Sequence, residues 1–260
     1  MPKFTTTENK RHWNEYAKKH KNALEGASYD ANLVELENLF IISELKKIKP
    51  KNLLDAGCGN GQRTKIFSKY VRGKTLGIDY SEIMIKQAKK LEKNNLKFEL
   101  ADLINYHTNS KYDVIISCRS IINQTSTVNQ IRLLKLLHGI LKPKGHLIIA
   151  EASVEGLKNL NQLRKNFRLG PIEEHWFNLH MKENIIFPKI KSLFQIKKIR
   201  RLGLFYYIAR VLHPAIVYPK EAKRTSIFND VAKKSQSIFL DSDSTFEKFG
   251  RHLLIHFQKK

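Results

Sequence analysis

The stretch Leu53-Leu54-Asp55-Ala56-Gly57-Cys58-Gly59-Asn60-Gly61-Gln62 decides the fold. Apolar residues lead into an acidic residue, and three glycines then stand at every second position before a helical pattern begins. This order predicts a buried strand that ends in a tight loop, where the missing side chains let a ligand lie against the backbone. The following helix offers that ligand its unpaired N–H groups. Several classes of nucleotide-binding protein share such a strand–loop–helix unit.

Strands and helices alternate regularly around this stretch. We predict strands at residues 53–56, 75–79, 97–100, 112–117 and 146–151, with helices over residues 63–70, 81–94 and 130–141. The strands are almost entirely apolar, which is typical of a parallel sheet covered by helices on both faces. Ligands of such sheets bind at the carboxyl ends of the strands.

Acidic residues stand at the ends of the second and third predicted strands. Asp79 ends the second strand, where a carboxylate can accept hydrogen bonds from both hydroxyls of a ribose. The neighbouring Ser81 is the better cap for the next helix, so Asp79 is not needed for capping. Asp102 ends the third strand within Ala101-Asp102-Leu103.

The pattern Asp-x-Gly-x-Gly-x-Gly over residues 55–61 resembles the first motif of class I S-adenosylmethionine-dependent methyltransferases. A nicotinamide-binding loop would more usually have Gly-x-Gly-x-x-Gly, and the Gly-Lys-Ser/Thr of a P-loop is absent. Asp79, Asp102, the segment 112–119 and the turn Leu141-Lys142-Pro143-Lys144-Gly145 follow in the order of that family. The resemblance implies a Rossmann-like sheet of seven strands, mostly parallel with an antiparallel last strand, and S-adenosyl-L-methionine as the cofactor.

The resemblance also implies which residues bind the cofactor. Asp102 would take the adenine amino group, and the end of the fourth strand would lie beneath the methionine part. Trp13-Asn14-Glu15-Tyr16-Ala17 is similar to an N-terminal segment that lies over the cofactor in many small-molecule methyltransferases. The expected cofactor-binding residues are Tyr16, Asp55, Gly57, Gly59, Gly61, Asp79, Tyr80, Asp102, Leu103, Cys118 and Arg119.

The whole chain is expected to form a single methyltransferase domain over residues 1–260, with three parts. Residues 1–48 form a helical cap with helices over 9–25 and 32–47, residues 50–151 form the cofactor-binding core, and residues 152–250 hold the acceptor-binding elements. In the third part we predict helices at 156–167 and 183–193 and an extended piece at 175–180. The last two strands are predicted at 194–201 and 251–258. The roughly fifty residues between them are long for a connection and predict a lid insertion.

Composition indicates a globular protein. The chain has 260 residues, of which 42% are hydrophobic and 27% charged, enough for one substantial core. We expect no membrane span and no secretory signal, because no apolar run approaches about 18 residues and the N-terminus is polar. The only cysteines, Cys58 and Cys118, are too few for a disulfide scaffold or a zinc site, so no metal is expected. The cytoplasm is the expected location.

The net charge of +23 favours either an anionic partner or simple compositional bias toward lysine. Residues 189–224 contain ten Lys or Arg but one acid, Glu221. This local excess predicts an anionic partner near the segment, which leaves open a phosphate-bearing small molecule, a nucleic acid or a lipid headgroup.

The acceptor is expected to be a small molecule. The Asn/Asp-Pro-Pro-aromatic signature of base and glutamine N-methylation is missing after the fourth strand, where Ser117-Cys118-Arg119-Ser120 stands instead. A hydroxyl acceptor must lose a proton, and histidine is the commonest base, so His175 or His180 is the candidate catalytic residue. The candidate substrate-binding residues are Asn123, Asn161, Arg164, Tyr207, Arg210 and His213. Of these, Asn123 would orient the acceptor, and Arg164 with Arg210 would hold an anionic group.

Further short segments, among them His175-Trp176-x-Asn178 and Tyr206-Tyr207-x-x-Arg210, look like a bacterial methyltransferase subgroup associated with surface-polysaccharide gene clusters. We therefore interpret the chain as an enzyme that O-methylates a sugar nucleotide or another phosphorylated precursor of a surface glycan. No specific nucleic-acid partner is expected. An RNA methyltransferase and a non-catalytic, cofactor-binding scaffold subunit are the alternatives. The oligomeric state stays open.

Overall fold

The structure is a computed structural model that describes residues 3–20, 30–240 and 245–260. Its centre is a seven-stranded sheet in the order β3-β2-β1-β4-β5-β7-β6. The strands are β1 (Asn52–Ala56), β2 (Lys74–Asp79), β3 (Leu96–Leu100), β4 (Tyr112–Cys118), β5 (Leu141–Ala152), β6 (Phe194–Arg201) and β7 (His252–Lys259). Only β7 runs antiparallel to its neighbours within the described sheet, so the predicted Rossmann-like fold is confirmed.

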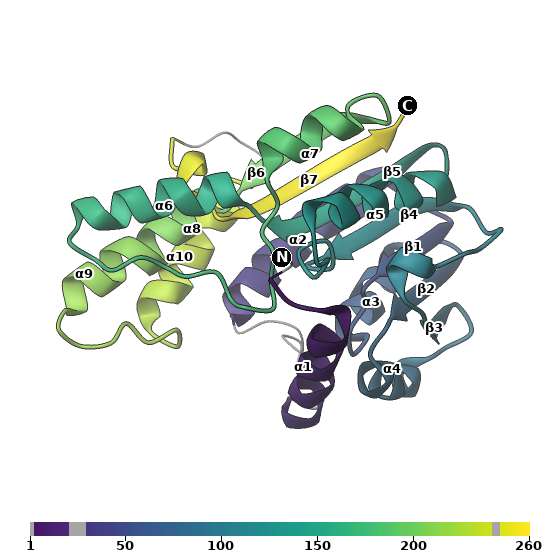
Figure 1. Cartoon of the computed structure of the whole chain (residues 1–260), viewed down its shortest axis with the longest axis horizontal. Coiled ribbons are helices and arrows are strands. Elements are labelled where there is room, and N and C mark those ends of the chain that lie inside the picture. The colour runs from purple at the N-terminus through teal and green to yellow at the C-terminus, as the bar shows by residue number, and fades with distance from the viewer. Residues whose placement is uncertain (1–2, 21–29, 241–244) are drawn as a thin grey trace.

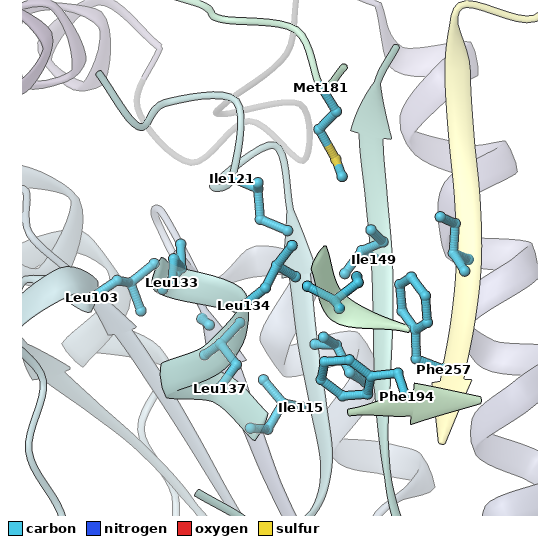
Figure 2. Packing of buried hydrophobic residues seen from close by; sticks show 14 of the residues in the cluster. Leu103, Ile115, Ile121, Leu133, Leu134, Leu137, Ile149, Met181, Phe194 and Phe257 are labelled. Atoms are coloured by element: carbon cyan, nitrogen blue, oxygen red, sulfur yellow. The ribbon is translucent and has the colours of Figure 1, made fainter. Parts of the chain in front are cut away.

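Helices cover both faces of this sheet, because the strands are apolar on both sides. On β4, Ile115 packs into one hydrophobic cluster while Val114 and Ile116 pack into the other. The first cluster lies under α5 (Thr127–Ile140) and α7 (Glu183–Ile190), and Figure 2 shows that Leu133, Leu134 and Leu137 of α5 are part of it. The second lies under α2 (Ala31–Ile48) and α3 (Gln62–Phe67), on the opposite face.

The described part of residues 202–250 contains short helices joined by turns. It contains α8 (Gly203–Tyr207), a π-helical turn (Ile208–Leu212), α9 (His213–Val217) and α10 (Ile227–Ile238). Figure 1 shows these helices gathered at the left of the view beside α6 (Val154–Asn166). Phe205 and Tyr206 of α8 are buried in the second cluster, so this insertion packs firmly on the body of the protein.

The N-terminal helix α1 (Thr6–Lys19) lies alongside α4 (Glu82–Ala88), below the sheet in Figure 1. Thr5 and Glu8 form a capping box that fixes its start. The helix was predicted over residues 9–25, and positions 21–25 lie outside the described residues.

Several predicted boundaries differ from the structure. The helix predicted at 130–141 begins at Thr127, because Ser126 caps it through Asn129 N, and the chain is already in β5 at Leu141. The helix predicted at 183–193 ends at Ile190. The piece predicted as extended at 175–180 forms no strand and runs as an irregular segment. Within the described ranges, no helix combines the length and the hydrophobicity that a bilayer span requires.

Candidate functional site

The loop between β1 and α3 is built from glycines in the left-handed region. Gly57, Gly59 and Gly61 have φ angles of 87°, 54° and 75°, which other residues rarely adopt. Gly57 N and Cys58 N both donate to the carbonyl oxygen of Ile78, at 2.8 and 2.9 Å. The loop is thereby held against the end of β2.

Asp79 joins this loop to the next helix. Its two carboxylate oxygens accept from Gly59 N at 2.9 Å and from Ser81 N at 2.8 Å. Burial raises the pKa of Asp79, while these backbone hydrogen bonds act to lower it. A third backbone N–H, that of Tyr80, also acts to lower this pKa. A carboxylate has about four acceptor positions, so the group keeps capacity for a ligand.

A hollow, here called the glycine-loop hollow, opens beside Asp79 at the carboxyl ends of the strands. Most of the residues expected to bind a cofactor line it: Gly57, Gly59, Asp79, Tyr80, Asp102, Leu103, Cys118 and Arg119. Asn123, expected at the acceptor, lines it too. The side chains come from the ends of β1, β2, β3 and β4, which shows why strand ends were the informative positions in the sequence.

Helix α1 covers this hollow and is fastened to it by side chains. Trp13 Nε1 donates to Asn123 Oδ1 at 3.1 Å, and Asn9 Nδ2 donates to the same oxygen at 3.2 Å. The hydroxyl of Tyr80 donates to Asn9 Oδ1 at 2.8 Å. Tyr16 is buried against Trp13, at 5.6 Å between ring centres, and does not line the hollow.

Asp55 and Gly61 also lie outside the glycine-loop hollow. Asp55 lines a smaller neighbouring hollow with Arg63 and Arg119. Its Oδ2 accepts from Thr64 Oγ1 at 2.6 Å, and burial raises its pKa to about 6. Gly61 precedes α3, and a Cβ added there would lie 2.7 Å from the ring of Phe98, so this glycine is required by packing.

Glu151, near the end of β5, was not singled out from the sequence. Its carboxylate accepts from the backbone N–H groups of Ser120 and Ile121, both at 3.0 Å, and of Ile122 at 3.3 Å. Burial raises its pKa to about 8. Glu151 thus fixes the loop after β4, in which Arg119 has a φ of 57°. The sequence feature that could have identified Glu151 is an acidic residue at the end of a long apolar strand.

A second hollow adjoins the first, and we call it the arginine hollow. Four arginines line it, namely Arg119, Arg210, Arg224 and Arg251. The lining also includes Trp13, Asp30, His175, His180, Tyr206 and His252. Trp13 and Arg119 line both hollows, so the two spaces meet at these side chains.

Two of these arginines form ion pairs with buried acids. Arg119 Nη1 lies 3.3 Å from Glu37 Oε1, and Arg210 pairs with Asp30. Burial lowers the pKa of Arg210, and Asp30 opposes that effect. Arg210 therefore stays charged at the edge of the hollow.

Both candidate bases, His175 and His180, line the arginine hollow. The ring of His175 is stacked on Phe177 with 5.1 Å between centres, and its pKa is lowered by burial and then by Arg251. His180 is only 2% exposed, and burial, followed by the charge of Arg251, lowers its pKa to about 2. Both rings are therefore neutral near pH 7.

The other residues that were expected to bind the acceptor are not part of the lining of either hollow. Arg164 donates to the carbonyl oxygens of Gly170 and Arg210, and Asn161 exchanges hydrogen bonds with the backbone of Ile172. These side chains hold the segment after α6 in place, so we assign them a structural role.

Tyr207 and His213 are likewise engaged in packing. Tyr207 is stacked on Phe246 and His213 on Phe228, each with 4.7 Å between ring centres. A π-helical turn separates them, and neither side chain is part of the lining of the arginine hollow.

A family model described as a methyltransferase domain matches residues 48–203. Over 91 residues the chain is 33% identical to a putative methyltransferase of Invertebrate iridescent virus 6, covering 35% of this chain and 34% of that protein. Over 123 residues it is 32% identical to malonyl-[acyl-carrier protein] O-methyltransferase 1 of Ilyobacter polytropus, covering 45% and 43%. The matched parts span less than half the length of these curated relatives.

Among solved structures, the magnesium protoporphyrin IX methyltransferase of Synechocystis, which was crystallised with S-adenosylmethionine, superposes with a TM-score of 0.59. The alignment covers 98% of this chain and 97% of that one at 13% identity. A likeness at this identity shows a shared fold over nearly the whole chain.

Proposed function

The chain belongs to the methyltransferase domain family, and from that membership we propose that it transfers the methyl group of S-adenosylmethionine to a hydroxyl oxygen of a small anionic molecule. The acceptor class is a sugar nucleotide or another phosphorylated precursor of a surface glycan. The observation that carries the proposal is the meeting of the glycine-loop hollow and the arginine hollow at Trp13 and Arg119.

The glycine-loop hollow fits the nucleoside of S-adenosylmethionine. Asp79 lines this hollow, and the acceptor capacity left on its carboxylate would serve the hydroxyls of a ribose. Asp102 Oδ2 already accepts from Asn105 at 2.9 Å and retains a further position for the adenine amino group. Leu103 and Tyr80 supply apolar surface for the ring.

The smaller hollow fits the amino-acid end of the same molecule. It is lined by one carboxyl group, Asp55, and by two guanidinium groups, Arg63 and Arg119. An ammonium and a carboxylate, the two ends of a methionine zwitterion, would find opposite charges there. The chain therefore offers complementary groups along the length of the cofactor.

Bound S-adenosylmethionine supplies an electrophilic methyl carbon on its sulfonium. The residues of this chain then have to hold the acceptor oxygen in line, exclude water and accept one proton. Trp13 and α1 cover the junction of the hollows. We assign the role of proton acceptor to His175 or His180, of which the exposed His175 is the stronger candidate because the pKa of His180 is so low.

The connection to surface glycans rests on the resemblance of short segments such as His175-Trp176-x-Asn178, and the arginines beside these histidines favour a phosphorylated precursor. A cytoplasmic location agrees with the free thiols of Cys58 and Cys118, because thiols persist in a reducing compartment.

The test is product detection by mass spectrometry after incubation with S-adenosylmethionine and a panel of acceptors. The panel contains neutral sugars, sugar phosphates, sugar nucleotides and an RNA transcript. We expect S-adenosylhomocysteine and a methylated sugar derivative only with phosphorylated sugars. Methyl transfer to a defined base of the RNA would contradict the proposal.

A further inference from the structure

The lining of the arginine hollow has an excess of positive charge. Arg119, Arg210, Arg224 and Arg251 contribute four guanidinium groups, whereas Asp30 is the only acidic side chain of the lining among the described residues. Glu37 adds one more carboxylate behind Arg119. Among the described residues, the lining therefore has more positive than negative groups, and an anion would lie there favourably.

Arg251 has a buried donor that the protein leaves unused. It directly precedes β7, and its guanidinium carbon lies 5.7 Å from the centre of the Tyr206 ring. Its Nε is buried and has no hydrogen-bond partner within the described residues. A buried donor without a partner calls for an explanation, and a bound ligand, ion or water in the hollow would provide one.

A second group in the same hollow is also unsatisfied. His180, which is 2% exposed, has no hydrogen-bond partner for Nδ1 in the part of the chain that the structure describes. The nearest carboxylate oxygen of Glu174 lies 3.7 Å away, beyond hydrogen-bonding distance. Both residues line the arginine hollow, and a polar ligand there would supply the missing partners.

We propose that the arginine hollow binds a phosphate monoester of the acceptor and that Arg251 is the residue that recognises it. This inference rests on the proposed function and narrows its acceptor to a compound with one terminal phosphate beside the reacting hydroxyl. A phosphate monoester carries a charge of about −1.5 to −2, which suits the excess of the lining better than a single carboxylate does. The guanidinium fork can donate two parallel hydrogen bonds to phosphate oxygens.

The experiment is calorimetric titration of protein loaded with S-adenosylhomocysteine, using inorganic phosphate, acetate and glucose as probes. The variants are Arg251→Gln, which removes the guanidinium, and Arg251→Lys, which keeps the charge but loses the fork. The matched control is Arg132→Gln, because this exposed residue of α5 lies outside both hollows and its loss changes the net charge equally. Thermal unfolding checks that each variant is folded.

We expect saturable binding of phosphate to the wild type and to Arg132→Gln, with weaker binding of acetate and none of glucose. Arg251→Gln should weaken phosphate binding by about 10- to 100-fold, as loss of charge-assisted hydrogen bonds predicts. Arg251→Lys should give an intermediate value, and it decides the question if Arg251→Gln does not fold.

Equal binding of phosphate to the wild type and the Arg251 variants would overturn the inference, as would tighter binding of acetate or the absence of a saturable phosphate site. A titration with S-adenosylhomocysteine precedes each measurement and distinguishes failure of the proposed function from failure of the phosphate site. If that cofactor product does not bind, the proposed function itself fails. If it binds and phosphate does not, only the phosphate site is wrong.

Discussion

Replacing Gly61 with alanine distinguishes a packing requirement from contact with the cofactor. The new Cβ would lie 2.7 Å from two ring carbons of Phe98 and 2.9 Å from Cβ of Ala88, at a φ of 75°. The left-handed backbone costs roughly 1–2 kcal/mol with a side chain, and overpacking adds about 1–3 kcal/mol. The free energy of unfolding should therefore fall by about 2–5 kcal/mol.

The assay is thermal unfolding followed by circular dichroism, where this loss corresponds to a fall in Tm of roughly 5–15 °C for a chain of this size. Gly139→Ala is the control, because a Cβ on that helical glycine of α5 meets nothing within 4 Å and should stabilise the protein by about 0.5–1 kcal/mol. An unchanged Tm for Gly61→Ala, with cofactor binding lost, would show that this position serves the ligand and refute the packing argument.

Three further outcomes follow from single groups. Burial, reinforced by His256, lowers the pKa of His146 to about 4 from the ordinary 6.5, so the unfolded chain binds more protons between these values. The contribution of His146 to stability should be constant above about pH 6.5 and fall by about 1–2 kcal/mol toward pH 4, allowing for solvent screening. His146→Gln should make the total fall smaller by that amount, while the buried His180, whose pKa is also low, keeps its own contribution; an identical profile would contradict this. Trp13→Phe removes one donor to Asn123 Oδ1. The variant should bind S-adenosylhomocysteine about 2- to 10-fold more weakly in calorimetry, with little change in Tm. Unchanged affinity would show that this contact of α1 does not contribute to cofactor binding. Burial raises the pKa of the Cys118 thiol to about 12, so alkylation by iodoacetamide at pH 8 should be slow until the chain unfolds; rapid labelling of the native protein would contradict this.

The sheet could be predicted from the sequence because buried parallel strands leave a distinctive pattern. A strand such as Leu53–Ala56 is apolar on both faces, and a glycine or an acid marks its end. Asp79 and Asp102 were found for this reason, since the carboxyl ends of neighbouring parallel strands meet at one edge. Helix boundaries were less certain, because the cap of α5, Ser126, stands before the first periodic apolar residue.

The acceptor side could be predicted only in part, because it is assembled from segments far apart in the chain. Arg164 and Arg210 have equal chemistry, yet only Arg210 lines the arginine hollow, while Arg164 donates to the backbone that carries Arg210. Arg251 stands just before the last strand and has no local signal beyond that place. Its importance depends on an unsatisfied Nε, which only the packed structure reveals.

The central claim is that the glycine-loop hollow binds S-adenosylmethionine through Asp79, and calorimetric titration of that cofactor tests it most directly. We predict one site per chain in the wild type and a loss of affinity of about 10- to 100-fold in Asp79→Ala, because the variant loses charge-assisted hydrogen bonds to the ribose. Wild-type affinity in Asp79→Ala, or no binding to the wild type, would contradict the claim.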